Sequence, residues 1–116
     1  MPAYNFKKEF AAKVEAETKR QTIRKPRKRP TVVGDILHLY TGIRTKKCRR
    51  LLPPVACHCV FDVLITEKGA RLDDYVVKEE NLNTFARRDG FESWDEMKDF
   101  FEKQYGLPFE GKIICW

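Results

Sequence analysis

The chain has 116 residues, a net charge of +6 and 42% hydrophobic residues, which allows one domain with its own core and excludes a disordered chain. No apolar run approaches the roughly 20 residues of a membrane span, and the charged N-terminal stretch lacks the apolar core of a signal peptide. We therefore expect a single cytoplasmic domain over residues 1–116, with its four cysteines as reduced thiols.

The positive charge is concentrated in one part of the sequence. Residues 19–50 contain twelve Lys or Arg and a single acid, Asp35, so this segment carries +11 and the remainder carries −5. A charge split of this kind points to an anionic partner, and nucleic acid is the usual one. Two alternatives stay open: a solvated basic face, and a chain that acts through an unknown protein partner.

A strand and then a helix are expected at the start of the chain. Residues 2–5 can form a short strand. Phe6, Phe10 and Val14 then recur every four residues, which is the spacing of one helix face. This periodicity predicts a helix over residues 7–17.

A basic loop is expected next, over residues 18–30. Seven of the eleven residues from 19 to 29 are Lys or Arg and none is acidic, while Pro26 and Pro30 prevent the helix from continuing. Loops held on a rigid scaffold commonly carry function. We therefore expect this loop to hold the functional site.

The middle of the chain predicts strands. Apolar and β-branched residues favour strands over 36–40, 55–66 and 72–77, and a second basic cluster, residues 44–50, lies between the first two. Along the strand expected at 55–66, Cys57 and Cys59 alternate onto the same face with larger apolar residues.

The Cys57–Cys59 pair raises the question of a metal site. Zinc is disfavoured because no second Cys or His pair lies at the spacing that zinc sites show. A disulfide between them is also disfavoured, since side chains two residues apart lie roughly 6.5–7 Å apart along a strand. We expect buried thiols, and neither a metal nor a cofactor.

The C-terminal third predicts two helices and a last strand. The first helix is expected over 80–88 and ends before Gly90, and the second begins at the capping box of Ser93 and Glu96. One side of the second helix is apolar and is expected in the core: Trp94, Met97, Phe100, Phe101 and Tyr105. A final strand is expected over 112–116.

Strands therefore outnumber helices, and strands stand at both ends of the element order. This pattern favours an α+β, mostly β, fold in which a compact β-barrel carries short helices packed outside. A ferredoxin-like sheet is the alternative that the element order leaves open.

The pattern Lys19-x-x-Thr22-x-Arg24 after the first expected helix resembles the signature of the ASCH domain, a member of the PUA-like β-barrel superfamily. That signature reads Gly-x-Lys-x-x-Glu-x-Arg. Lys19 and Arg24 match it, Thr22 stands at the Glu position, and Glu17 stands at the Gly position. Similarity to small stand-alone ASCH proteins covers nearly the whole chain and includes residues 34–37, 37–46, 89–91 and 105–112.

The resemblance implies a PUA-like barrel with a central cleft that is lined by the signature loop and binds RNA or nucleotides. Lys19 and Arg24 would hold a phosphate or a base edge, and Tyr40 could stack on a base. The remaining expected ligand contacts come from the two basic clusters and would follow the RNA backbone: Arg27, Lys28, Arg29, Arg44 and Lys46.

One branch of the ASCH family hydrolyses N(4)-acetylcytidine, which gives an alternative function. Those enzymes carry Lys-x-x-Thr in this loop and a Glu near the later helix turn. This chain is similar at Lys19 and Thr22, and Asp89 stands at the Glu position. Thr22 would then be the nucleophile and Lys19 its base, with Asp89 orienting Lys19 or returning the proton. Another nucleoside or RNA hydrolase would belong to the same class, although no residue pair argues for a ribonuclease.

Overall fold

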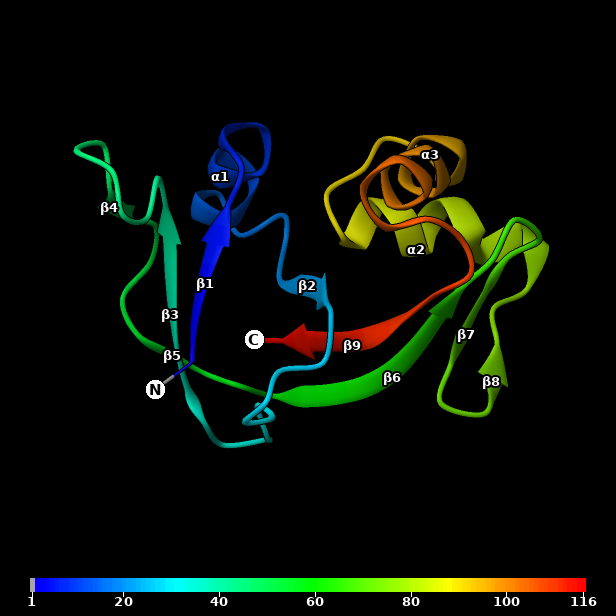
Figure 1. Cartoon of the computed structure of the whole chain (residues 1–116), viewed down its shortest axis with the longest axis horizontal. Coiled ribbons are helices and arrows are strands. Elements are labelled where there is room, and N and C mark those ends of the chain that lie inside the picture. Colours follow the sequence, from blue (N-terminus) through cyan, green and yellow to red (C-terminus); the bar gives the residue numbers. More distant parts are fainter. Residues whose placement is uncertain (1) are drawn as a thin grey trace.

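The computed structural model describes residues 2–116, in which nine strands form two sheets (Figure 1). The first sheet, on the left of Figure 1, is built around β3: β1 runs parallel to β3, whereas β4 and β5 pair antiparallel with it. On β3, fully buried Leu37 and Leu39 alternate with the partly exposed His38 and Tyr40, as the two-residue period of a strand requires. Its strands are β1 (Ala3–Phe6), β3 (Ile36–Thr41), β4 (Arg49–Arg50) and β5 (Val55–Ala56).

The second sheet is antiparallel, with the strand order β2-β9-β6-β7-β8. Strand β2 is at its edge and pairs with β9, so that Thr22 lies opposite Ile114 and Arg24 opposite Lys112. Gly111 allows this close pairing, because a Cβ there would lie 2.5 Å from the main-chain oxygen of Arg24. The strands are β2 (Gln21–Arg24), β6 (Cys59–Ile65), β7 (Ala70–Leu72), β8 (Tyr75–Val76) and β9 (Phe109–Cys115).

The helices cover one side of the two sheets, with α1 beside the first sheet and α2 and α3 over the second (Figure 1). Helix α3 begins where Ser93 accepts a hydrogen bond from the Glu96 main-chain N–H at 3.2 Å. Helix α2 ends at Arg88, and Gly90, with a φ of 96°, turns the chain two residues later. None of the helices within residues 2–116 is long and apolar enough to cross a membrane. The helices are α1 (Lys8–Glu15), α2 (Leu82–Arg88), preceded by a 3-10 turn (Glu79–Asn81), and α3 (Trp94–Tyr105).

Two hydrophobic cores hold these layers together. One packs α2 and α3 on the second sheet and contains the fully buried Met97 and Phe101, which each contribute about 1.5–3 kcal/mol by burial. The other packs α1 on the first sheet around Val14 and includes the C-terminal Trp116. Phe10 of α1 contacts both cores, so it lies where the two halves of the molecule meet.

The α+β class expected from the sequence is confirmed, with 32% of residues in strands and 26% in helices. The strands of residues 2–116 form two open sheets, and no closed barrel is found among them. They also do not form the single ferredoxin-like sheet. The expected strand at 2–5 and helix at 7–17 correspond to β1 and α1, and the expected helices at 80–88 and from 94 correspond to α2 and α3.

The basic segment expected to be a loop over 18–30 is partly a strand. Residues 21–24 form β2, because the β-branched Thr22 and Ile23 favour an extended backbone and Ile23 is buried in the core at 5% exposure. The backbone of this segment pairs antiparallel with β9 along one side. Residues 18–20 and the part from Lys25 to residue 30 lie outside helices and strands.

Two of the expected strands are each divided. The strand expected over 55–66 is interrupted at Cys57 and His58, where the chain leaves the first sheet and enters the second. There the Cys57 main-chain N–H donates to Asp35 of the first half, while that of His58 donates to Cys115 of β9, both at 2.8 Å. The strand expected over 72–77 is instead the hairpin of β7 and β8.

Candidate functional site

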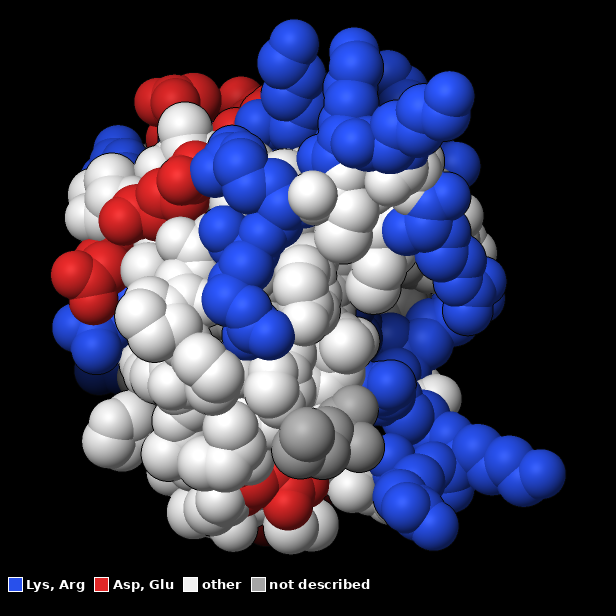
Figure 2. All heavy atoms as spheres, turned by 90° about the vertical axis from the view of Figure 1, so that its left-hand side faces the viewer, with Lys and Arg blue, Asp and Glu red and all other residues white. Residues whose placement is uncertain are grey.

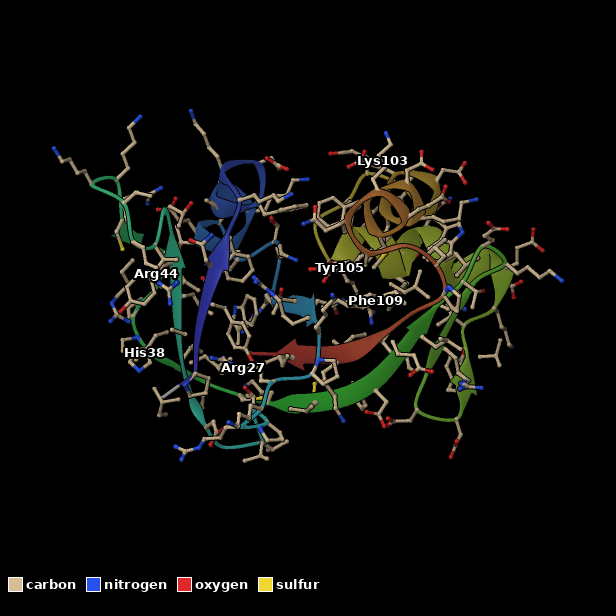
Figure 3. The ribbon with its side chains drawn as sticks, viewed as in Figure 1. Arg27, His38, Arg44, Lys103, Tyr105 and Phe109 are labelled. Carbon is tan, nitrogen blue, oxygen red and sulfur yellow. The ribbon has the colours of Figure 1, made fainter. Side chains whose placement is uncertain are left out.

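A pocket of about 250 Å³ lies between α1 and α3, with the edge strand β2 contributing to its wall. In Figure 3, Tyr105 is labelled in the region between α3 and β2, on the side where this pocket lies. The aromatic part of its lining comes mainly from α1 and α3 and includes Phe6, Phe10, Phe100 and Tyr105. The polar part combines four groups that the sequence analysis selected: Lys19, Thr22, Arg24 and Asp89.

Lys19 and Asp89 form a buried ion pair across the pocket, although 70 residues separate them. The Lys19 ammonium donates to the main-chain oxygen of Asp89 at 2.5 Å and lies 3.3 Å from its Oδ1. Their exposed fractions are only 3% and 4%. Gln21 donates to the same Oδ1 at 3.4 Å. Gly90 makes the approach of Lys19 possible, since a Cβ there would lie 2.9 Å from the Lys19 Cδ.

Burial disfavours the charged forms of both partners. Desolvation lowers the pKa of the Lys19 ammonium below its ordinary value, and the attraction of Asp89 offsets this only in part. Desolvation likewise raises the pKa of the Asp89 carboxyl, against the opposing effects of Lys19 and Gln21. A lysine whose pKa is lowered in this way is suited to accept a proton, which an ordinary surface lysine is not.

Thr22 and Arg24 lie two residues apart on β2, so their side chains project from the same face of the strand. The Arg24 Nε donates to Thr22 Oγ1 at 2.8 Å, and its Nη2 donates to the main-chain oxygen of Asn5 at 2.7 Å. The guanidinium also lies 5.0 Å from the ring centroid of Phe6. These contacts fix Arg24 next to a buried hydroxyl, and burial lowers the pKa of Arg24.

The other six residues selected from the sequence do not line this pocket. The Arg27 guanidinium lies 4.9 Å from the ring centroid of Tyr4, and the Arg24 guanidinium lies 5.3 Å from the same centroid. Tyr40, on the first sheet, accepts a hydrogen bond at 2.7 Å from Arg50 instead of facing the pocket. Figure 3 shows Arg44 on that same side, away from Tyr105. The remaining three are exposed: Lys28, Arg29 and Lys46.

The surface on the first-sheet side is strongly basic. In Figure 2, Lys and Arg side chains gather over the upper and right-hand parts of this face, and acidic side chains lie toward its left and lower edges. Strand β4, which belongs to this sheet, consists of Arg49 and Arg50. Arg49 is partly neutralised by Glu15 at 2.5 Å.

Sequence reasoning missed several residues that complete the pocket. Tyr105 was expected in the core, but it lines the pocket and is 39% exposed. Phe10, which was given only as part of a helix face, lines the pocket as well as packing against both cores. Asn5 contacts Arg24 through its main-chain oxygen, which no side-chain pattern can reveal. Lys7 and Gln104 were not singled out either, and both line the pocket.

The cysteines do not contribute to the pocket. Desolvation raises the pKa of Cys57, and that of Cys115 to about 12, so both thiols stay protonated and unreactive near neutral pH. Cys59 lies opposite Cys115 in the β6–β9 pairing. Within residues 2–116, no group of three or more Cys, His, Asp or Glu residues is arranged to hold a metal ion.

Comparisons of this chain with protein-family models, with curated proteins and with solved structures give no match. Its function must therefore be inferred from the pocket itself, together with the sequence pattern around Lys19, Thr22 and Arg24.

Proposed function

We propose that this chain is an ASCH-type domain that binds RNA or a nucleotide and holds one base in the pocket. The observation that carries the proposal is the convergence of Lys19, Thr22, Arg24 and Asp89 in a single pocket with aromatic walls. Its volume of about 250 Å³ lies just below the roughly 300 Å³ at which pockets for drug-sized ligands begin. One base or one nucleoside suits that size better than a longer segment.

The two walls of the pocket match the two sides of a nucleobase. The flat faces of a base stack on aromatic rings, and the exposed Tyr105 and the partly exposed Phe100 offer such rings in the lining. The polar edge of a base needs donors and acceptors at fixed positions. Arg24 is held by Thr22 and Asn5 and can supply a donor, while Asp89 can supply an acceptor.

The proposal extends to the PUA-like fold and to a cytoplasmic location. In support of the first, the segment that resembles the ASCH signature follows the first helix and lines the pocket, as the resemblance implies for a central cleft. In support of the second, all four cysteines are free thiols, which a reducing compartment maintains. RNA beyond the bound base would follow the exposed basic segments, residues 27–29 and 44–50.

The salt dependence of binding tests this proposal. A strand that contacts about four phosphates should lose about fiftyfold in affinity for single-stranded RNA between about 50 and 200 mM salt. Arg24→Ala should weaken binding further, whereas Arg71→Ala, which removes an exposed arginine from β7, should not. A dissociation constant that stays constant over this salt range would exclude the RNA-binding function.

A second function, hydrolysis of an acetylated cytidine nucleoside, is favoured by one specific observation. The carboxylate of Asp89 reaches Lys19, at 3.3 Å, in the same pocket as Thr22. A neutral Lys19 would accept the Thr22 proton as the hydroxyl attacks the acetyl carbonyl. The cytidine amine would then leave with a proton, and water would release acetate from Thr22. The lowered pKa of Lys19 supports its role as the base.

This activity is followed by the loss of the acetylated chromophore when the protein is incubated with N(4)-acetylcytidine. Thr22→Ala and Lys19→Ala should abolish turnover, Thr22→Ser should retain part of it, and Thr84→Ala, which changes an exposed threonine on α2, should retain all of it. The rate should rise with pH while Lys19 loses its proton, since the neutral amine is the active form. Equal rates in the parent protein and Thr22→Ala would rule out this nucleophile.

A further inference from the structure

Three cationic side chains lie in or beside the pocket lining without an acidic partner: Lys7 and Arg24 line the pocket, and Lys25 contacts the lining residue Tyr105. Lys7 precedes α1, Arg24 ends β2, and Lys25 follows it. Lys7 and Lys25 are exposed, and Arg24 is partly exposed. The ion pairs found within residues 2–116 include none of the three. The one carboxylate in the pocket lining, Asp89, is already paired with Lys19, so these three charges remain uncompensated.

Both lysines contact residues in the C-terminal half of α3. The Lys7 ammonium lies 4.8 Å from the ring centroid of Phe100 and 3.4 Å from Gln104 Oε1. The Lys25 ammonium lies 4.9 Å from the ring centroid of Tyr105, the next residue along the chain from Gln104. All three α3 residues line the pocket. The charges are therefore held at its rim by neutral contacts, which leave their remaining hydrogen-bond donors available.

A ligand matched to this rim has an anionic group attached to a planar ring. We propose that Lys7, Arg24 and Lys25 form a phosphate subsite, so that the pocket takes a nucleoside carrying a phosphate in preference to a free nucleoside. This inference rests on the proposed binding of a base in the pocket. The phosphate belongs either to a free nucleotide or to the backbone of an RNA strand, and both present the same oxygens to the rim.

The other basic segments are less suited to this first phosphate. Arg27 contacts Tyr4, which is not a lining residue, whereas Lys25 contacts Tyr105, which is. Residues 44–50 belong to the first-sheet side of the molecule. Those segments can meet only phosphates further along a strand. The rim lysines lie against the same residues that would contact the base, so they are the ones that can distinguish a nucleotide from a nucleoside.

Calorimetric titration tests the subsite, using the four ribonucleosides, their 5′- and 3′-monophosphates and a single-stranded RNA of about five nucleotides at about 50 mM salt. Each exposed lysine that contacts the phosphate should contribute about fivefold in affinity. For at least one base, we expect a phosphate-bearing ligand to bind about tenfold or more tightly than the nucleoside. Within each protein, the gain is the ratio of the affinity for the phosphate-bearing ligand to that for the nucleoside. Lys7→Gln/Lys25→Gln should remove most of this ratio, because only Arg24 then remains in the subsite.

The matched control is Lys8→Gln/Lys103→Gln. It removes two exposed lysines, one at the first residue of α1 and one on α3, and neither lines the pocket. Figure 3 shows Lys103 on the side of α3 opposite to Tyr105. This control should keep the full preference for phosphate-bearing ligands. If both double variants lose this preference equally, the subsite is overturned, and the preference comes from the overall positive charge of the protein. Tighter binding of the monophosphates supports the subsite and identifies a free nucleotide as the source of the phosphate. Tighter binding of the RNA alone also supports it and identifies the RNA backbone as the source. Equal affinities for nucleosides, monophosphates and RNA would overturn the subsite but leave base binding intact, and no binding of any of them would overturn both.

Discussion

Replacing Asp89 with asparagine should destabilise the fold by about 3 kcal/mol at neutral pH, because Lys19 then stays buried without a counter-charge. Lys19 is 3% exposed, and its ammonium lies 3.3 Å from the Asp89 carboxylate. Removing one partner of a buried ion pair costs about 3–5 kcal/mol. We expect the lower end of this range, because Lys19 also donates to the main-chain oxygen of Asp89, which the substitution retains.

The loss of stability caused by Asp89→Asn should become smaller as the pH rises. Without the carboxylate, the folded-state pKa of Lys19 falls further below its unfolded value, because Asp89 is the main group that raises it. The folded protein then binds fewer protons than the unfolded chain, so its stability increases with pH. The deficit of Asp89→Asn should therefore shrink from neutral to alkaline pH.

The complementary variant Lys19→Met should show the opposite slope. Here the folded-state pKa of Asp89, already raised by burial, rises further because its main counter-charge is lost. The folded protein then binds more protons than the unfolded chain above the unfolded pKa, so stability falls as the pH increases from acid to neutral. The deficit of Lys19→Met should be smallest in acid.

Urea unfolding at about pH 5, 7 and 9, followed by the fluorescence of Trp94 and Trp116, measures both slopes. The matched control is Asp62→Asn, which breaks a pair of the same residue types, Asp62 and Lys112, at the surface. That change should cost at most about 1 kcal/mol. The reasoning fails if Asp89→Asn costs no more than Asp62→Asn, or if Asp89→Asn and Lys19→Met change with pH in the same direction.

Two further predictions concern turns and caps, and thermal unfolding measures both. Gly90→Ala should cost about 3 kcal/mol, because it combines a φ of 96° with a Cβ only 2.9 Å from Lys19 and 3.0 Å from Phe10. Gly34→Ala has the same φ in open space and should cost only about 1 kcal/mol, so equal losses would show that the contact with Lys19 does not matter. Ser93→Ala removes the N-cap of α3 and should cost about 1 kcal/mol, whereas an unchanged melting temperature would mean that this cap contributes nothing.

Local signals explain which parts of the fold could be predicted from the sequence. The four-residue recurrence of Phe6, Phe10 and Val14 predicts α1, and the Ser93 cap predicts the start of α3. Each of these signals depends only on residues within a few positions of each other. The helices are therefore close to their expected limits.

The pairing of the strands depends on contacts distant in the sequence, which local patterns do not contain. Strand β2 becomes a strand because β9, about 90 residues later in the chain, offers its edge. Cys57 and His58 interrupt the expected strand because their main-chain N–H groups donate to Asp35, just before β3, and to Cys115 of β9. The same limitation explains why a closed barrel was expected where the described strands form two open sheets.

The candidate site was predicted in part, for a reason of the same kind. Lys19, Thr22 and Arg24 lie within six residues, so their pattern was visible, and Asp89 was connected to them only by the resemblance to the ASCH family. Its contact with Lys19 depends on the turn after α2 reaching the end of α1. Trp94, Met97 and Phe101 of the α3 stripe are buried in the core as expected, whereas Tyr105 is 39% exposed and lines the pocket. An apolar stripe does not reveal which of its members lacks a packing partner.

The energetics of the Lys19–Asp89 pair favour a role in ligand binding over a role in stability. A buried ion pair is a weak source of stability, and replacing both partners with apolar residues of similar volume is often neutral or stabilising. Hydrophobic side chains at positions 19 and 89 could therefore fill the region near Phe10 where the two cores meet. Lys19→Met/Asp89→Leu should accordingly cost much less than the sum of the two single losses, yet abolish base binding. A double variant that is stable and still binds would show that the pair serves the fold, whereas loss of binding in a stable protein would assign it to the ligand.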